Sequence, residues 1–141
     1  MHLAKITVLG MSLALAAPVA QAEDAQAKLP FSKAVRVGDM LYLSGELGAK
    51  PGTMELVPGG IGPETRQTMD NIKATLEANG SDLDHVVRCL VMMADIKEWA
   101  AMNEVYRTYF TDRFPARSAM GASGLALGAR VEIECMATVK E

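Results

Sequence analysis

Arg117 is the residue whose type and surroundings best suit a binding site for a small anion. It lies in the sequence F-P-A-R-S-A-M-G over residues 114–121, where small neighbours let a ligand approach the backbone. A guanidinium held on a strand presents a planar fork of donors that matches a carboxylate. A surface arginine paired with a nearby acid explains the same segment equally well, so both interpretations stay open.

Glu132 and Glu134 are the acidic residues that could act on a bound molecule. Side chains alternate along a strand, so the two glutamates share one face of the last predicted strand while Val131, Ile133 and Cys135 take the other. A carboxylate in a partly dry pocket can position and deprotonate a water molecule. A solvated strand face is the commoner explanation of such a pair.

Two further polar positions are candidates for contact with a ligand. Asn103 follows the inward-facing Met102 on a predicted helix, where it can hydrogen-bond a ligand or simply face solvent. Ser44 and Gly45 end a predicted strand, where a hydroxyl and a flexible backbone can line a pocket. A plain junction between a strand and a loop accounts for them equally well.

Metal, histidine-based and nucleic-acid chemistry find little support. The chain has two histidines, His2 and His85, and its two cysteines form no C-x-x-C motif, so we expect neither a zinc site nor a histidine triad. The formal net charge is −3 and no Lys/Arg run occurs, which argues against a nucleic-acid partner. The glycine-rich residues 59–62 lack the lysine of a phosphate-binding loop.

Cys89 and Cys135 both lie in apolar runs, and their redox state is open. A disulfide between them is permitted if the chain is exported. Two buried thiols that behave as small hydrophobic side chains are at least as consistent with the pattern.

The elements that must position these residues alternate between strands and helices. A hairpin is predicted over residues 34–44, with Gly38 at the first position of a type II′ turn. Met69, Ile72 and Leu76 recur at helical spacing, and Asp95 with Glu98 forms a capping box for a second helix. The remaining expected elements are a helix over 63–79, a second helix ending before Pro115, a short strand at 54–57, and strands over 85–94, 117–123 and 131–139.

This order predicts a mixed α/β (α+β) domain in which two helices cover one face of a single sheet. The chain supplies no third helix for the other face of the sheet. Association into an oligomer would cover the apolar side chains left there. With 141 residues and no internal repeat, we expect a single domain over residues 23–141.

Residues 1–22 have the anatomy of a secretory signal peptide. Lys5 gives a weakly positive start, residues 6–20 are almost wholly apolar or small, and Ala20-Gln21-Ala22 forms an A-x-A cleavage pattern. The run is short for a membrane span of roughly 20 apolar residues, and Pro18 interrupts it. We therefore expect cleavage near Ala22, a periplasmic or secreted mature protein, and no stable membrane insertion afterwards.

Taken together, these segments resemble the RidA family, also called YjgF/YER057c/UK114. The match covers residues 29–139 and is carried by several segments in order. They are L-S-G at 43–45, E-T-R-Q-T-M-D-N-I at 64–72, V-V-R at 86–88, M-N-E-V-Y at 102–106, F-P-A-R-S at 114–118 and V-E-I-E at 131–134.

The resemblance implies a chorismate-mutase-like fold assembled as a homotrimer, with pockets in the clefts between subunits. In the family's deaminases, the arginine at the position of Arg117 binds the carboxylate of a 2-imino acid, and the glutamate at the position of Glu132 handles the attacking water. Ser44, Asn103 and the backbone near Ala119 would line the same cleft. Phe31 stands where these deaminases often have tyrosine. The products are a 2-keto acid and ammonia, and neither a metal nor an organic cofactor is implied.

Two other functions compete with this one. A non-catalytic binder of small carboxylates would keep Arg117 and the trimer but turn nothing over. Ribonuclease or translation-inhibitor activity is sometimes ascribed to the family, but the acidic net charge and the missing basic patch count against it.

Overall fold

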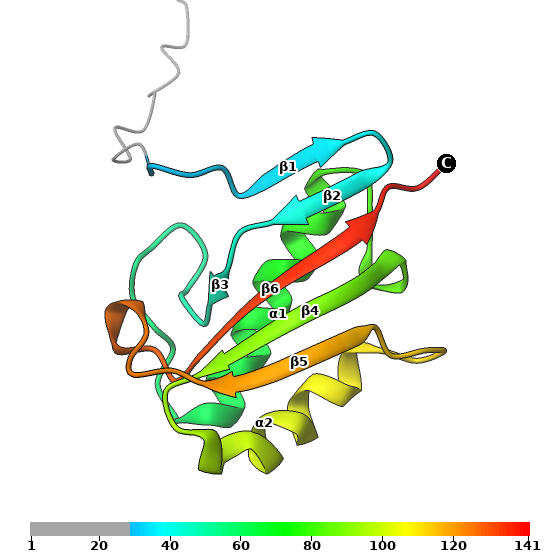
Figure 1. The fold of residues 1–141 in the computed structure, drawn as a ribbon. Helices are drawn as coiled ribbons and strands as arrows, with labels where there is room; N and C mark the ends of the chain where they lie inside the picture. The colour runs from blue at the N-terminus through cyan, green and yellow to red at the C-terminus, as the bar shows by residue number, and fades with distance from the viewer. Residues whose placement is uncertain (1–28) are drawn as a thin grey trace, which may run out of the picture.

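The computed structural model describes residues 29–141, which form one sheet and two helices (Figure 1). The predicted signal peptide and its cleavage site lie outside the described residues. The elements in chain order are β1 (Ala34–Val37), β2 (Met40–Leu43), β3 (Glu46–Leu47), α1 (Ile61–Ala78), β4 (Val86–Met93), α2 (Trp99–Tyr106), β5 (Ala116–Gly121) and β6 (Val131–Thr138).

The predicted hairpin is confirmed. β1 and β2 pair antiparallel, with Val37 opposite Met40 across a two-residue turn. Gly38 has a φ of 58°, whereas the φ of Asp39 is not positive. A type II′ turn requires a positive φ at the first of its two central residues and not at the second. Glycine is suited to this position because it adopts a positive φ without steric cost.

The strands follow the order β1-β2-β6-β4-β5, so β1 and β5 are the two edges of the sheet. β4 and β5 are parallel and are connected through α2, whereas the other pairs are antiparallel. β2 and β3 both pair with the same side of β6, β2 with its end and β3 with its beginning. Ser44 and Gly45 therefore interrupt what would otherwise be one long strand beside β6.

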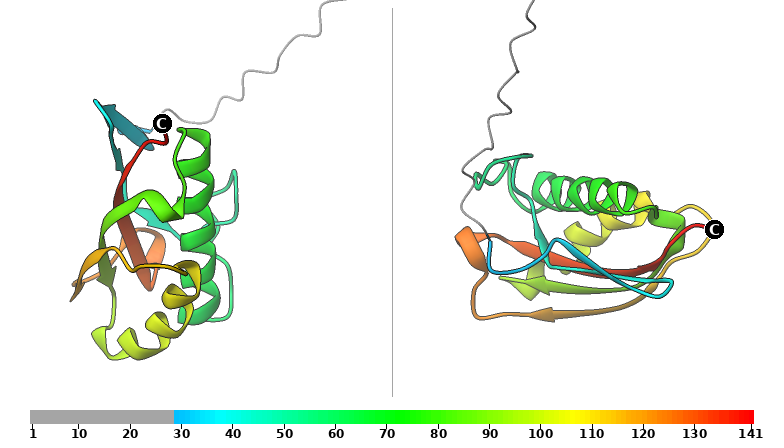
Figure 2. Two further views of the ribbon diagram at one scale, coloured as in Figure 1. Left: turned by 90° about the vertical axis from the view of Figure 1, so that its right-hand side faces the viewer. Right: turned by 90° about the horizontal axis from the view of Figure 1, so that it is seen from above.

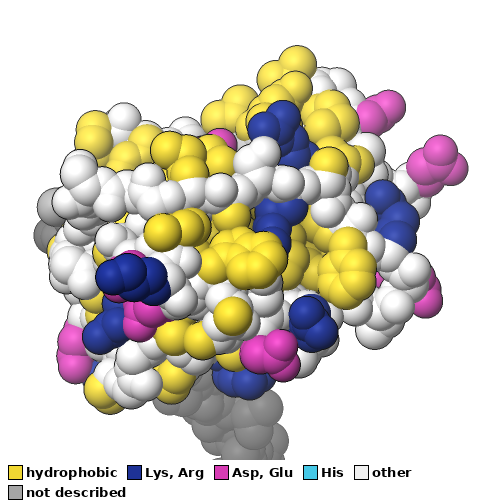
Figure 3. Space-filling model, turned by 60° about the horizontal axis from the view of Figure 1, so that its bottom comes forward, with side chains coloured by type: hydrophobic (Ala, Val, Ile, Leu, Met, Phe, Trp, Pro, Cys, Tyr) yellow, Lys and Arg dark blue, Asp and Glu magenta, His cyan; other side chains and the backbone are white. Residues whose placement is uncertain are grey.

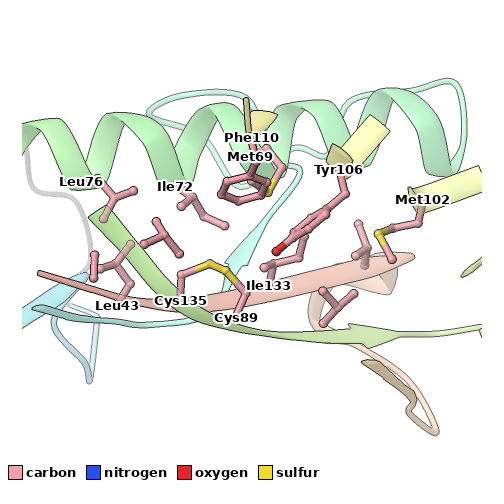
Figure 4. Packing of buried hydrophobic residues seen from close by; sticks show 14 of the residues in the cluster. Leu43, Met69, Ile72, Leu76, Cys89, Met102, Tyr106, Phe110, Ile133 and Cys135 are labelled. Carbon is pink, nitrogen blue, oxygen red and sulfur yellow. A yellow bond between two sulfur atoms is a disulfide. The ribbon is translucent and has the colours of Figure 1, made fainter. Parts of the chain in front are cut away.

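Both helices cover the same face of the sheet, as the order of elements predicts (Figure 2). Met69, Ile72 and Leu76 of α1 and Met102 of α2 are completely buried between the two layers. Figure 4 shows these side chains packed against residues of β4 and β6. α1 ends at Ala78, just before the predicted stop at Asn79 and Gly80.

Cys89 and Cys135 form a disulfide in the core (Figure 4). They lie directly opposite each other on β4 and β6, with Cα atoms 4.1 Å apart. Their exposed fractions are 1% and 2%, so the sulfur atoms are shielded from solvent. Of the two alternatives left by the sequence, the structure has the disulfide.

The other face of the sheet carries apolar side chains that no described element covers. Val35, Val37, Tyr42 and Met120 are all more than 40% exposed. Alternation along the strands points them away from the helices, since their neighbours Leu41 and Leu43 are buried in the core. We call this surface the open face of the sheet.

Two local expectations are wrong. Residues 54–57 form no strand, and Leu56 makes only an isolated bridge to Ala49, whereas β3 occupies two residues that were expected to be loop. Asp95 does accept a hydrogen bond from the Lys97 amide, but the Glu98 carboxylate pairs with Arg130 instead of completing the capping box. The segment over 96–98 is consequently a 3₁₀ turn, and α2 begins after it.

Candidate functional site

Arg117 lies on the edge strand β5 and points toward α2. Its Nη1 donates a hydrogen bond of 2.7 Å to Oδ1 of Asn103. Its guanidinium carbon lies 4.7 Å from the ring centroid of Tyr106 and 6.0 Å from that of Trp99. The faces of aromatic rings attract a cation electrostatically, so α2 holds the guanidinium in place from two directions.

The sequence of α2 explains how one helix makes all three contacts. Trp99, Asn103 and Tyr106 are spaced by four and three residues, which places them along one side of the helix. Met102, one residue away from this line, turns into the core and anchors the helix. Because Asn103 follows the buried Met102, its side-chain amide lies on the side of α2 that faces β5, within hydrogen-bond distance of Arg117.

The charge of Arg117 is not neutralised within the described residues. None of the ion pairs found in residues 29–141 includes Arg117. Its hydrogen-bond partner is a neutral amide, and its other neighbours are aromatic rings. The interpretation of Arg117 as a surface arginine paired with an acid therefore fails for this part of the chain, and its guanidinium is available to an external carboxylate.

Tyr106 supports the guanidinium from within the core. Its hydroxyl points from α2 toward the sheet (Figure 4) and has no hydrogen-bond partner among the described residues. Burial raises the pKa of this phenol to about 12, although the nearby charge of Arg117 acts in the opposite direction. Tyr106 is therefore neutral over the physiological range, and its contribution to Arg117 comes from the ring face.

Glu132 lies on β6 in a second cluster, beside Gly45. A Cβ atom on Gly45 would stand 2.1 Å from Oε1 of Glu132, so the carboxylate rests where only glycine leaves room. Desolvation raises the pKa of Glu132, and the negative charge of Glu134 raises it further. A carboxylate with a raised pKa is a stronger base when ionised, as activation of water requires.

Ser44 precedes Gly45 in the chain and so adjoins this second cluster. The Ser44 hydroxyl donates a 2.6 Å hydrogen bond to the carbonyl oxygen of Ser32, which fastens the segment before β1 to the interruption between β2 and β3. The side chain of Phe31, one residue earlier, is 54% exposed. Ser44 still has lone pairs that can accept a hydrogen bond from a ligand.

A buried acid in α1 supports the start of β6, and the sequence reasoning did not single it out. Oε1 of Glu64, whose exposed fraction is 4%, accepts a 2.6 Å hydrogen bond from the Arg130 amide and a 3.4 Å bond from the Val131 amide. These bonds fix the backbone immediately before Glu132. The sequence did offer a signal for this residue. Glu64 lies in the first turn of a helix and within residues 64–72, one of the segments that carry the family resemblance.

Arg117 and Glu132, the two residues predicted to be catalytic, point to opposite faces of the sheet. Arg117 pairs in register with Cys89 and points to the helix-covered face, where Asn103 and the half-buried Ala119 also lie. Glu132 alternates with the buried Val131 and Ile133, so it points to the open face. One copy of the chain does not bring Arg117 and Glu132 together.

The comparisons with known proteins give the same family for the whole domain. The family model described as Endoribonuclease L-PSP matches residues 21–139. The chain belongs to the RidA family. A *Capra hircus* protein named 2-iminobutanoate/2-iminopropanoate deaminase is 45% identical over 108 residues, covering 77% of this chain and 79% of the relative. The *Homo sapiens* protein of that name is 41% identical over the same shares of the two chains.

Solved structures of RidA relatives share the fold. A protein of *Thermotoga maritima* described as a putative endoribonuclease superposes with a TM-score of 0.77 at 39% identity, covering 82% of this chain and 91% of its own. RidA from an Antarctic Psychrobacter superposes with a TM-score of 0.75 at 39% identity, covering 80% of this chain and 91% of its own. The E. coli protein TdcF, solved with bound serine, superposes with a TM-score of 0.75 at 28% identity, covering 81% of this chain and 91% of its own.

Residues 29–141 contain no group of three or more His, Cys, Asp or Glu side chains placed to hold a metal ion. Within the same residues, no helix has the length and apolar character needed to cross a membrane. A hollow of about 350 Å³ on the open face is lined by Tyr42, Arg88, Leu90, Glu134 and Met136 among others, and it contains neither Arg117 nor Glu132.

Proposed function

We propose that this RidA-family protein is a deaminase that hydrolyses small 2-imino acids to 2-keto acids and ammonia. The observation that carries the proposal is the unneutralised guanidinium of Arg117, which Asn103 and two aromatic rings hold on the edge of the sheet. Relatives that are 41–45% identical are named for this reaction with four-carbon and three-carbon substrates. The proposal needs no metal and no organic cofactor.

In the proposed reaction, Arg117 binds the substrate carboxylate through two parallel hydrogen bonds. Glu132 accepts a proton from a water molecule, whose oxygen forms a bond to the imine carbon. The substrate nitrogen takes up protons, its bond to carbon breaks, and ammonia leaves as the new hydroxyl loses its proton to become the keto oxygen. The raised pKa of Glu132 supports this role because it makes the ionised carboxylate a stronger base toward the water molecule.

We propose further that each site is completed between copies of the chain in a homotrimer, with Arg117 from one copy and Glu132 from its neighbour. The opposite directions of these side chains within one copy support this arrangement. The apolar open face supports association, since a contiguous apolar patch of this kind marks a contact surface. Ser44 and Phe31 would enter the site with Glu132, and Asn103 and Ala119 with Arg117.

The direct test is release of ammonia and keto acid from 2-iminopropanoate and 2-iminobutanoate formed in situ. We expect wild type to exceed the spontaneous rate, and Arg117→Ala to lose at least ~100-fold in kcat/KM because the carboxylate loses its charged partner. Arg117→Lys is the matched control, which keeps the charge but not the fork, and should recover only part of the loss. Glu132→Gln should lower kcat while the affinity for the keto-acid product is retained.

A mixing experiment tests the shared site. Arg117→Ala and Glu132→Gln subunits carrying different tags are coexpressed, and mixed trimers are purified by both tags. If each site combines Arg117 from one subunit with Glu132 from the next, every mixed trimer has one intact site of three, so about a third of wild-type activity is expected. Mixed trimers as inactive as either parent would show that both residues act within one copy.

A carboxylate-binding protein without turnover is the second candidate. It is favoured by the same Arg117 geometry and by the TdcF structure, whose bound serine carries a carboxylate. Wild type that binds keto acids through Arg117 but does not exceed the spontaneous hydrolysis rate would establish this candidate and exclude the deaminase.

We also propose that the protein is exported and that the signal peptide is removed near Ala22. The buried disulfide supports this location, because disulfides persist in oxidising compartments such as the periplasm. N-terminal sequencing of the periplasmic fraction tests it: a mature terminus near Glu23 is expected, and full-length protein confined to the cytoplasm would refute export.

A further inference from the structure

An exposed aromatic side chain lies beside Arg117. Trp99 opens α2, and 45% of its surface is exposed although its ring lies 6.0 Å from the guanidinium carbon. Figure 3 looks at the molecule from the side of α2 and β5 and shows hydrophobic side chains gathered there with Lys or Arg side chains between them. An exposed apolar residue next to a charged anchor is typical of a site that binds an amphipathic ligand.

The surface continues away from Arg117 as an apolar shelf. Ala119 and Gly121 follow Arg117 on the same face of β5, so no large side chain rises from the strand there. Ile96 closes the far end: it is 47% exposed, and its Cβ atom lies 3.4 Å from the place a Cβ on Gly121 would occupy. The shelf is thus bounded by Trp99 and Ile96 and floored by Ala119 and Gly121.

The position of the anchor determines which part of a ligand reaches this shelf. The carboxylate carbon of a ligand paired side-on with a guanidinium lies roughly 4 Å from the guanidinium carbon. In a 2-imino acid, the side chain begins only two bonds beyond that carboxylate carbon. The side chain can therefore reach a ring whose centre is 6.0 Å from the same guanidinium carbon.

We propose that Trp99 is a specificity-determining residue, which contacts the substrate side chain and makes the enzyme prefer larger apolar 2-imino acids, such as that of leucine, over 2-iminopropanoate. The inference rests on the proposed deaminase function. Methyl and isobutyl side chains differ by three carbon atoms, and each additional carbon against an apolar wall favours the larger substrate. We expect kcat/KM for the leucine imine to exceed that for the alanine imine by about 10-fold or more.

The test compares the two imines, generated in situ from alanine and leucine, in wild type, Trp99→Ala and Trp99→Phe. The ratio of the two kcat/KM values is the readout, because a general loss of activity cancels in it. We expect the ratio to fall toward one in Trp99→Ala and to be largely retained in Trp99→Phe, which keeps an aromatic wall. An unchanged ratio in Trp99→Ala, or no preference in wild type, would overturn the inference.

A binding measurement separates this inference from the proposed reaction. Trp99 is the one tryptophan in the chain, so intrinsic tryptophan fluorescence reports on this position alone. Titration with pyruvate and with 4-methyl-2-oxopentanoate should change the emission, with tighter binding of the longer keto acid and no response in Arg117→Ala. If neither imine is turned over but this order of affinities holds, the deaminase reaction fails and the role of Trp99 stands. If imines are turned over and the two keto acids bind equally, the role of Trp99 fails and the reaction stands.

Discussion

The buried disulfide gives the most quantitative prediction for the stability of this protein. Replacing Cys89 and Cys135 together by alanine removes a cross-link between β4 and β6 that closes a loop with a sequence separation of 46 residues. In the chain-entropy model, a loop of this length stabilises the folded state by ~4 kcal/mol, because the unlinked unfolded chain has more conformations. Measured effects commonly fall below this value, so we expect a loss of about 2–4 kcal/mol in the free energy of unfolding.

The assay is urea denaturation of wild type and the double variant, followed by circular dichroism. Both proteins are compared at one protomer concentration, since the stability of an oligomer depends on concentration. Wild type unfolded in the presence of a reductant is the matched control and should behave like the double variant. Because the two cysteines are only 1% and 2% exposed, folded wild type should also resist reduction until it opens.

Two outcomes would refute this reasoning. A double variant as stable as oxidised wild type would show that the cross-link does not restrict the unfolded chain as the loop length requires. Titration of two free thiols per chain, in denatured protein purified from an oxidising compartment, would show that the disulfide does not form there.

Three further predictions concern the site. Asn103→Asp should weaken keto-acid binding by about 10-fold or more in calorimetry, because an internal carboxylate competes for Arg117, whereas Asn103→Ala should have a smaller effect. Glu134→Gln removes a charge that raises the pKa of Glu132, so the rise of kcat with pH should move to lower pH, and an unmoved limb would contradict this coupling. Tyr106→Phe removes a buried hydroxyl without a partner among the described residues, so thermal unfolding should show unchanged stability or a gain of up to about 1 kcal/mol.

The elements of the fold were predictable because their residues alternate or recur over enough positions to distinguish a strand from a helix. α1 follows from Met69, Ile72 and Leu76, and the hairpin from the Gly38-Asp39 turn. β3 was missed because two residues, Glu46 and Leu47, show no period at all. Its position follows only from its pairing with β6, a contact between segments far apart in the chain.

The candidate site residues could be named from the sequence one by one, but their arrangement in space could not. The spacing of Trp99, Asn103 and Tyr106 could have indicated one face of α2 directed at a single partner. Alternation says which residues of one strand share a face, but it does not relate the faces of two strands. The opposite directions of Arg117 and Glu132 depend on the registers of β5 and β6 against β4, which the sequence does not encode locally.

Those registers would connect the stability of the proposed trimer to its chemistry. Arg117 belongs to an edge strand and faces the helices, whereas Glu132 belongs to an inner strand and faces away from them. No change of side-chain conformation carries either group through the sheet, so the proposed reaction requires a second copy whose open face meets the edge of the first. In the proposed trimer, exposed apolar side chains such as Val37 and Tyr42 would act on catalysis as well as on assembly, because the contact they form would set the distance between Arg117 and Glu132. On this account, the face of the sheet that the chain leaves uncovered is a requirement of the active site and not a defect of the fold.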